Sequence, residues 1–203
     1  MPPAYPLTRH SAIRGAALFA FGAVVLSFFD GFHTHSGTTV YRETLALQAA
    51  WWTPLLFASA AGFGGLAYAL AHRRLAPAHP QPPWSQIGIF MLVYGACYAA
   101  TAWVRVSPWS MLALLAAAAA GAWWLLDRSP VGIVLALATG VTGCATEASL
   151  IAGGHFRYTR PDVVGVPVWL FGLYLLSAVV VGAMARRLVT PRREASRSPT
   201  GRS

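Results

Sequence analysis

Charged side chains are scarce in this chain: they make up 10% of its 203 residues, whereas hydrophobic residues make up 56%. Soluble globular proteins carry about 25% charged residues, so this composition excludes a sizeable soluble domain. Lysine is absent, and all fifteen basic residues are arginine. This absence, together with abundant alanine, indicates a GC-rich bacterial genome.

Acidic residues are also few, six against fifteen arginines, and the formal net charge is +9. An excess of positive charge is compatible with nucleic-acid binding. Here, however, the arginines lie at the ends of apolar segments and in the C-terminal tail, which is typical of an integral membrane protein. The sequence therefore predicts a membrane protein that binds no nucleic acid.

Neither the cysteines nor any common catalytic motif in the sequence indicates a disulfide framework or an enzymatic activity. The two cysteines, Cys97 and Cys144, fall within apolar segments and are expected to be small buried residues rather than disulfide partners. The chain contains no nucleophile elbow, no P-loop and no glycine-rich nucleotide motif. We therefore predict no cofactor, and no motif points to catalysis.

Six apolar segments, each about long enough to cross a bilayer, occupy most of the chain. A hydrocarbon core of about 30 Å requires roughly 20 apolar residues in a helix, and a segment in lipid must satisfy its own backbone hydrogen bonds. The sequence therefore predicts an all-α, polytopic membrane protein, a bundle of six transmembrane helices within residues 1–187. The predicted spans are 11–29, 44–70, 86–104, 108–126, 130–152 and 163–185. Residues 188–203 are predicted to form a disordered basic tail.

The arginines predict the orientation of these spans. With the N-terminus in the cytoplasm, eleven arginines fall on the inner side and four on the outer side, namely Arg42, Arg105, Arg157 and Arg160. Positive charge is enriched on the cytoplasmic side of membrane proteins. We therefore expect a multi-pass protein of the bacterial plasma membrane with both termini in the cytoplasm.

Glu147 lies inside the fifth predicted span. A carboxyl group in hydrocarbon is costly, so its side chain is expected to face the interior of the bundle and to be hydrogen-bonded or protonated. Two interpretations remain open. Glu147 could anchor the polar head of a lipid, or it could make a structural hydrogen bond between helices.

Several other polar residues fall near the outer boundary, on segments predicted as loops: Asp30, His33, His35, Glu43 and His155. Groups of histidine and carboxylate can bind a metal ion. The spacing of His33 and His35 is not a usual zinc spacing, and no third ligand is set by sequence distance. Solvated loop residues are therefore the expected interpretation, and no metal site is predicted.

Asp127 follows the fourth span directly and precedes Arg128. It could form a surface ion pair with Arg128, which would contribute little to stability. It could also cap the helix that begins near Pro130, because aspartate is a favoured N-cap residue. The sequence favours the cap.

Four short motifs, in order along the chain, resemble the Insig (insulin-induced gene) family. They are Ala50-Trp51-Trp52-x-Pro54, Trp84-Ser85, Trp123-Trp124-x-x-Asp127-Arg128-Ser129-x-x-Gly132, and Tyr158-Thr159-x-Pro161-Asp162 with Trp169-Leu170. The resemblance covers residues 45–187. The chain departs from the family between Val141 and Tyr158, where it is a few residues longer. Glu147, within this stretch, has no counterpart in the family. The first 44 residues match poorly.

This resemblance implies six membrane helices and no catalysis. Eukaryotic Insig proteins bind oxygenated sterols and engage sterol-sensing membrane proteins, with the sterol against the third and fourth helices. The residues that match Trp123 and Asp127 belong to the partner-binding region. The resemblance therefore implies an amphiphile-binding scaffold, with partner contacts near Trp123 and Asp127.

The residues and the resemblance together favour a non-enzymatic protein that binds or senses a membrane lipid. The expected ligand is a neutral amphiphile, sterol-like or diacylglycerol-like, in an intramembrane cavity. Its polar head is expected to meet Glu147, Asp30, Tyr98 and Thr101. The alternative is a membrane-embedded enzyme acting on an isoprenoid or lipid with Glu147 as general acid. A small transporter is disfavoured because no chain of intramembrane charges is present.

The fourth span is also expected to contact another protein. Its alanine run, Ala116–Ala120, and Gly121 present small side chains that let membrane helices approach closely. We therefore expect a homo-oligomer through the third and fourth spans, and a membrane-protein partner at the same helices is a further possibility.

Overall fold

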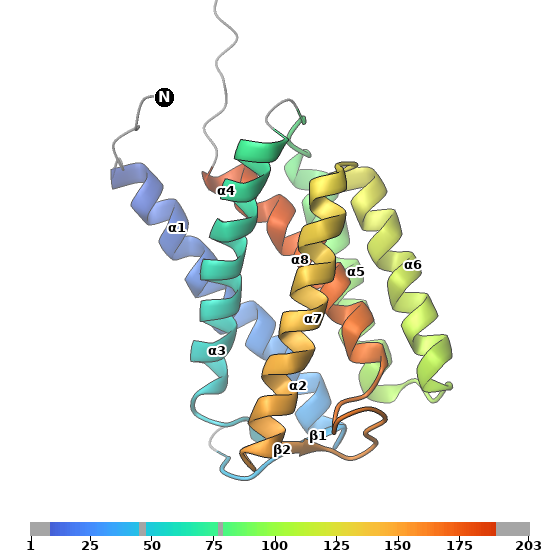
Figure 1. Cartoon of the computed structure of the whole chain (residues 1–203). Helices are drawn as coiled ribbons and strands as arrows, with labels where there is room; N and C mark the ends of the chain where they lie inside the picture. Colours follow the sequence, from blue (N-terminus) through green and yellow to red (C-terminus); the bar gives the residue numbers. More distant parts are fainter. Residues whose placement is uncertain (1–8, 45–47, 77–78, 190–203) are drawn as a thin grey trace, which may run out of the picture.

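The computed structural model describes residues 9–44, 48–76 and 79–189 (Figure 1). Six helical segments within these residues are long and apolar enough to cross a membrane. The first, Ile13–His35, lies within α1 (Arg9–Phe21), a π-helical turn η1 (Gly22–Leu26) and α2 (Ser27–His35). The second comprises α3 (Thr53–Ser59), the π-helical turn η3 (Ala60–Gly64) and α4 (Gly65–Leu75). The other four are α5 (Trp84–Trp103), α6 (Pro108–Leu126), α7 (Pro130–Ala152) and α8 (Trp169–Val189).

A two-stranded antiparallel ribbon closes one end of the bundle. Its strands are β1 (Thr39–Tyr41) and β2 (Phe156–Tyr158), and Thr39 pairs with Tyr158. We call this end the ribbon end. The described chain begins with α1 and finishes with α8 at the opposite end, which we call the termini end (Figure 1).

Serine and proline set the starts of α6 and α7. The side chains of Ser107 and Ser129 accept hydrogen bonds from the backbone N–H groups of Ser110 and Gly132, and a proline follows each serine. Proline suits the first turn of a helix because an N–H is not needed there. The prediction that Asp127 caps α7 is therefore wrong: Ser129 is the N-cap, and Asp127 lies two residues earlier.

The helix bounds also differ from the predicted spans, most of all in the first, second and last segments. The first helical segment continues to His35, because the chain leaves the helix only at Gly37, whose φ of 72° suits glycine. The second segment begins at Thr53, and the last begins at Trp169, after a turn closed by Val163 and Val166. The transmembrane bounds remain a prediction. Of the predicted tail, Leu188 and Val189 lie in α8, and residues 190–203 lie outside the described residues.

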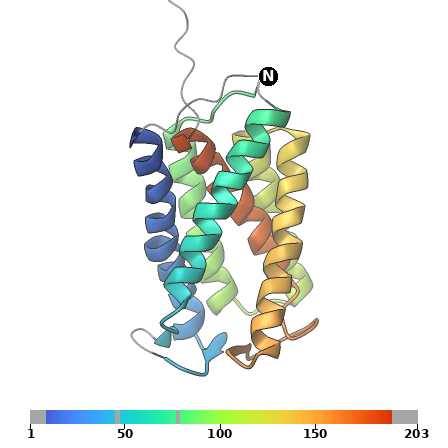
Figure 2. The same cartoon turned by 60° about the vertical axis from the view of Figure 1, so that its left-hand side comes forward.

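Helix α8 lies in the middle of the bundle and packs against α4, α5, α6 and α7 (Figure 2). In the most apolar 18-residue stretch of α8, 72% of the residues are buried inside the protein. In the corresponding stretch of α7, 17% are buried. Close packing depends on Gly182, where a Cβ would lie 2.7 Å from the Tyr68 ring. The core of this protein is thus built around its last helix.

Candidate functional site

Buried and half-buried polar side chains gather in the half of the bundle nearest the ribbon. We call this group the ribbon-end cluster. Its members come from α2, β1, α5, α7, β2 and α8, and they are Asp30, His33, Tyr41, Tyr98, Thr101, Glu147, Tyr158 and Tyr174. Because a buried polar group is costly unless it is hydrogen-bonded, the contacts within this cluster decide its chemistry.

Glu147 accepts hydrogen bonds from two tyrosines. The Tyr158 hydroxyl donates to Oε2, and the Tyr174 hydroxyl donates to Oε1 at 2.5 Å. Tyr158 is buried, whereas Glu147 is only half-buried. Both carboxyl oxygens therefore face phenols of this chain.

Asp30 and His33 lie on α2 and not on a loop, so the prediction of a loop from Asp30 is wrong. The Asp30 carboxylate accepts a hydrogen bond from Tyr41 at 2.9 Å. The His33 Nε2 atom lies 2.8 Å from the Thr101 hydroxyl oxygen, and the His33 ring lies 5.1 Å from the Tyr98 ring. His33 thus connects Asp30, whose Oδ1 lies 3.9 Å from its Nδ1, with the two polar residues of α5.

The structure therefore brings Asp30, Tyr98 and Thr101 together, and Glu147 is near enough to interact electrostatically with Asp30. Their role in lipid binding remains a prediction. Of the other polar residues, His155 packs against Trp52, with 6.0 Å between ring centroids, and Glu43 is exposed. Within the described residues, no group of three or more histidine, cysteine or acidic side chains could hold a metal ion.

The tyrosines of the ribbon are the members that sequence reasoning missed. Burial raises the pKa of Tyr158 well above its ordinary value, and the nearby charge of Glu147 raises it further. Burial, and then the charge of Asp30, likewise raise the pKa of Tyr41. Both phenols therefore remain hydrogen-bond donors at neutral pH. Only the pairing of β1 with β2 places them beside the two acids, and no local pattern in the sequence signals that pairing.

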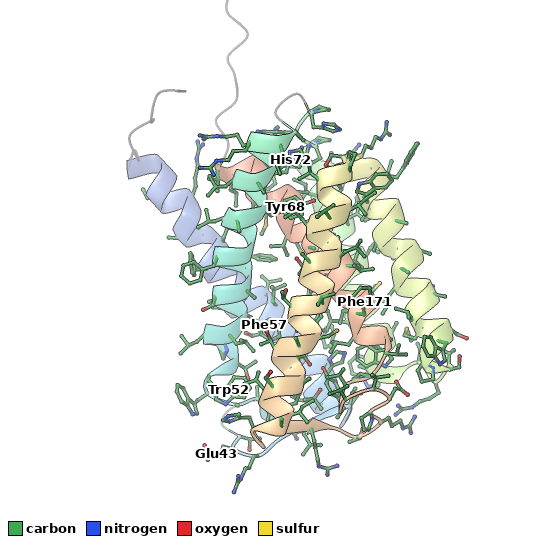
Figure 3. The ribbon with its side chains drawn as sticks, viewed as in Figure 1. Glu43, Trp52, Phe57, Tyr68, His72 and Phe171 are labelled. Atoms are coloured by element: carbon green, nitrogen blue, oxygen red, sulfur yellow. The ribbon has the colours of Figure 1, made fainter. Side chains whose placement is uncertain are left out.

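A second polar cluster lies at the termini end and is centred on Asp127. This carboxylate accepts hydrogen bonds from Tyr68 and from the Ser129 N–H at 3.1 Å, and its Oδ1 lies 3.0 Å from His72 Nε2. Its Oδ2 also lies 3.4 Å from a guanidinium nitrogen of Arg186. Figure 3 shows Tyr68 and His72 in this region of α4. We call these residues the Asp127 cluster.

The Asp127 cluster is closed to the outside. Burial by itself raises the pKa of Asp127, but the hydrogen bonds from His72, Ser129 and Tyr68 and the charge of Arg186 outweigh it and hold that pKa below its ordinary value. Trp123 belongs to the same region, because its Nε1–H donates to the Ser129 carbonyl at 2.9 Å. The partner-binding role of Trp123 and Asp127 remains a prediction, and a partner would meet the surface that this cluster shapes rather than the covered carboxylate.

Comparison with known proteins supports the same scaffold. No family model matches the chain. The insulin-induced gene 2 protein of Xenopus tropicalis is 30% identical over 193 residues, which cover 92% of this chain and 88% of that protein. This chain belongs to the Insig family. Insulin-induced gene 1 proteins of Danio rerio and Homo sapiens are 29% and 27% identical, covering 86% and 91% of this chain and 72% and 69% of theirs.

An Insig homologue of known structure has the same fold. The crystal structure of MvINS, from Mycobacterium vanbaalenii, matches with a TM-score of 0.79 and 27% identity, covering 92% of this chain and 98% of that one. A cross-linked trimer of an MvINS variant matches with the same TM-score. The predicted family and the predicted six-helix membrane bundle are therefore confirmed. The protein is a multi-pass membrane protein of Insig type.

Proposed function

We propose that this protein is a non-enzymatic membrane sensor that holds a neutral amphiphile, sterol-like or diacylglycerol-like, with the amphiphile's polar head at the ribbon-end cluster. The observation that carries this proposal is the concentration of hydroxyl donors and two acids among apolar side chains in the half of the bundle nearest the ribbon. Ligand sites are mostly apolar with a few convergent polar groups, and this combination suits a long apolar body with one small polar head.

Glu147 and Asp30 would act as acceptors for a hydroxyl on the ligand. Each now accepts from a tyrosine of this chain, so a lipid hydroxyl would replace a phenol or share the carboxylate with it. The half-buried position of Glu147 supports access from the side of α7, the helix whose apolar window is least buried. Tyr98 and Thr101 would line the path between the two acids.

The same contacts count against the alternative in which Glu147 is a general acid. A general acid must carry a proton that it can give to the substrate. Both oxygens of Glu147 accept from tyrosine hydroxyls, and two such donors favour the ionised carboxylate, which has no proton to give. The proposal therefore remains a binding protein rather than an enzyme.

We further propose that the chain functions in the plasma membrane of a bacterium as a homo-oligomer that contacts itself through α5 and α6. The cross-linked trimer of an MvINS variant supports homo-oligomerisation in general. A separate membrane-protein partner at Trp123 and Asp127 would be compatible with the same surface.

Replacing Glu147 tests the lipid proposal. Purified protein would be titrated with dioleoylglycerol and with a hydroxylated sterol and observed by native mass spectrometry. We expect the wild type to retain at least one of them and Glu147→Ala to bind it about ten- to a hundredfold more weakly, since the lost hydrogen bond is worth about 1–3 kcal/mol.

The exposed acid Glu43 at the same end of the molecule offers a matched control, and Glu43→Ala should bind like the wild type (Figure 3). Unchanged lipid binding by Glu147→Ala, together with a lower unfolding temperature, would assign Glu147 a structural role only. A wild-type protein that binds neither lipid would contradict the proposal as a whole.

A further inference from the structure

A small polar pocket of about 80 Å³ opens at the ribbon end and is separate from the acids of the ribbon-end cluster. It lies between the turn that joins α5 to α6, the ribbon and the start of α8. The polar residues that line it are Thr38, Thr101, Arg105, Tyr158, Thr159 and Arg160. It has room for several water-sized groups, so a small ion or the head of a lipid would fit.

Two arginines give the pocket its charge. Arg105 and Arg160 are exposed, and within residues 9–44, 48–76 and 79–189 no acidic side chain forms an ion pair with either. The nearest acid in sequence, Asp162, accepts a hydrogen bond from the Val168 N–H at 3.0 Å. The rim of the pocket therefore carries two guanidinium groups whose donors are available to a ligand.

The floor of the pocket carries no charge, and its two hydroxyl groups are already hydrogen-bonded to residues behind it. The Thr101 hydroxyl is hydrogen-bonded to His33, and the Tyr158 hydroxyl donates to Glu147. Both residues are buried. The Thr159 hydroxyl at the rim donates to the Thr38 carbonyl at 3.4 Å. The ligand that fits is therefore one that accepts from the arginines at the rim, and it does not need to reach the acids.

The surroundings of the pocket are those of a membrane interface. Trp103 and Trp109, on either side of the α5–α6 turn, are exposed, and so are Val104 and Val106 within it. Tryptophan is enriched at the level of lipid headgroups, where apolar and aqueous surroundings meet. Such surroundings suit a ligand that comes from the headgroup region of a bilayer.

We propose that this pocket binds a phosphate group, supplied either by a phospholipid headgroup or by free phosphate. Guanidinium groups match phosphate oxygens in geometry and form charge-assisted hydrogen bonds with them. This site is distinct from the neutral-lipid site proposed above, because it uses the two arginines at the rim and leaves Glu147 and Asp30 behind the floor.

The double variant R105Q/R160Q tests the proposal in the full-length, delipidated protein. Dioleoyl phosphatidylglycerol would be titrated by native mass spectrometry, and inorganic phosphate by thermal shift. We expect the variant to bind phosphatidylglycerol, inorganic phosphate or both at least about tenfold more weakly than the wild type, since charge-assisted hydrogen bonds are lost. Binding of dioleoylglycerol should be unchanged, which separates this site from that of Glu147.

A matched control is available at the same end of the molecule. Arg42 and Arg157 are exposed and do not line the pocket, so R42Q/R157Q removes the same charge without touching it. Loss of phosphatidylglycerol binding alone, in R105Q/R160Q only, would identify a headgroup site, and parallel loss of inorganic phosphate would identify a general phosphate site. Equal losses in both double variants, or no loss in R105Q/R160Q, would overturn the proposal.

Discussion

Among single residues, Asp127 has the clearest energetic consequence. Its side chain and that of Arg186 are 1% and 3% exposed, so replacing Asp127 leaves a buried guanidinium without its charged partner. Breaking a buried pair in this way costs about 3–5 kcal/mol. We therefore expect Asp127→Ala to lower the unfolding temperature by about 10 °C, measured by a thermal shift assay in detergent.

Two further variants make the Asp127 result specific. Removing both charges in D127A/R186M should restore part of the loss, because no unpaired buried charge remains. Glu43 is exposed, so Glu43→Ala should have the same unfolding temperature as the wild type. An Asp127→Ala protein as stable as the wild type would show that the Asp127 cluster does not hold α4 and α8 together.

At the scale of elements, α6 presents a stripe of small residues to the outside. Ala113, Ala117 and Ala120 are exposed, whereas Ala119 is buried against the core. Residues at spacings of four and three lie on one helical face, and small side chains there allow close helix contact. If copies of this chain meet at α6, A113L/A117L should prevent close packing and reduce the oligomer seen by chemical crosslinking in nanodiscs.

Helix α7 supplies the comparison for this experiment. Ala138 and Ala145 are also exposed, so A138L/A145L adds the same volume to a different outer surface and should leave the oligomer intact. Oligomers that persist in A113L/A117L but disappear in A138L/A145L would move the interface to α7. A wild-type protein that stays monomeric in nanodiscs would exclude the homo-oligomer.

For the whole molecule, the distribution of arginines predicts its orientation in the membrane. The termini end holds Arg14, Arg73, Arg74, Arg128, Arg186 and Arg187. The ribbon end holds Arg42, Arg105, Arg157 and Arg160. The excess of arginine, counted with the C-terminal segment, predicts that the termini end faces the cytoplasm. A reporter that is active only in the periplasm should be silent when fused after Ser203 and active when fused after His155. The reverse pattern would show that the protein has the opposite orientation.

The six helices and the family could be predicted from the sequence. A helix that spans lipid satisfies its own backbone hydrogen bonds, and its apolar length is visible in the chain. The predicted starts of α6 and α7, at Pro108 and Pro130, agree with the structure, although the cap of α7 is Ser129 and not Asp127. The folded structure was needed to show that α8 is central and that Asp127 meets Tyr68 and Arg186. It was also needed to show that the ribbon brings Tyr41 and Tyr158 to the two acids. These contacts join residues from different helices and strands, and such pairings depend on how side chains of the whole bundle pack together rather than on any local pattern.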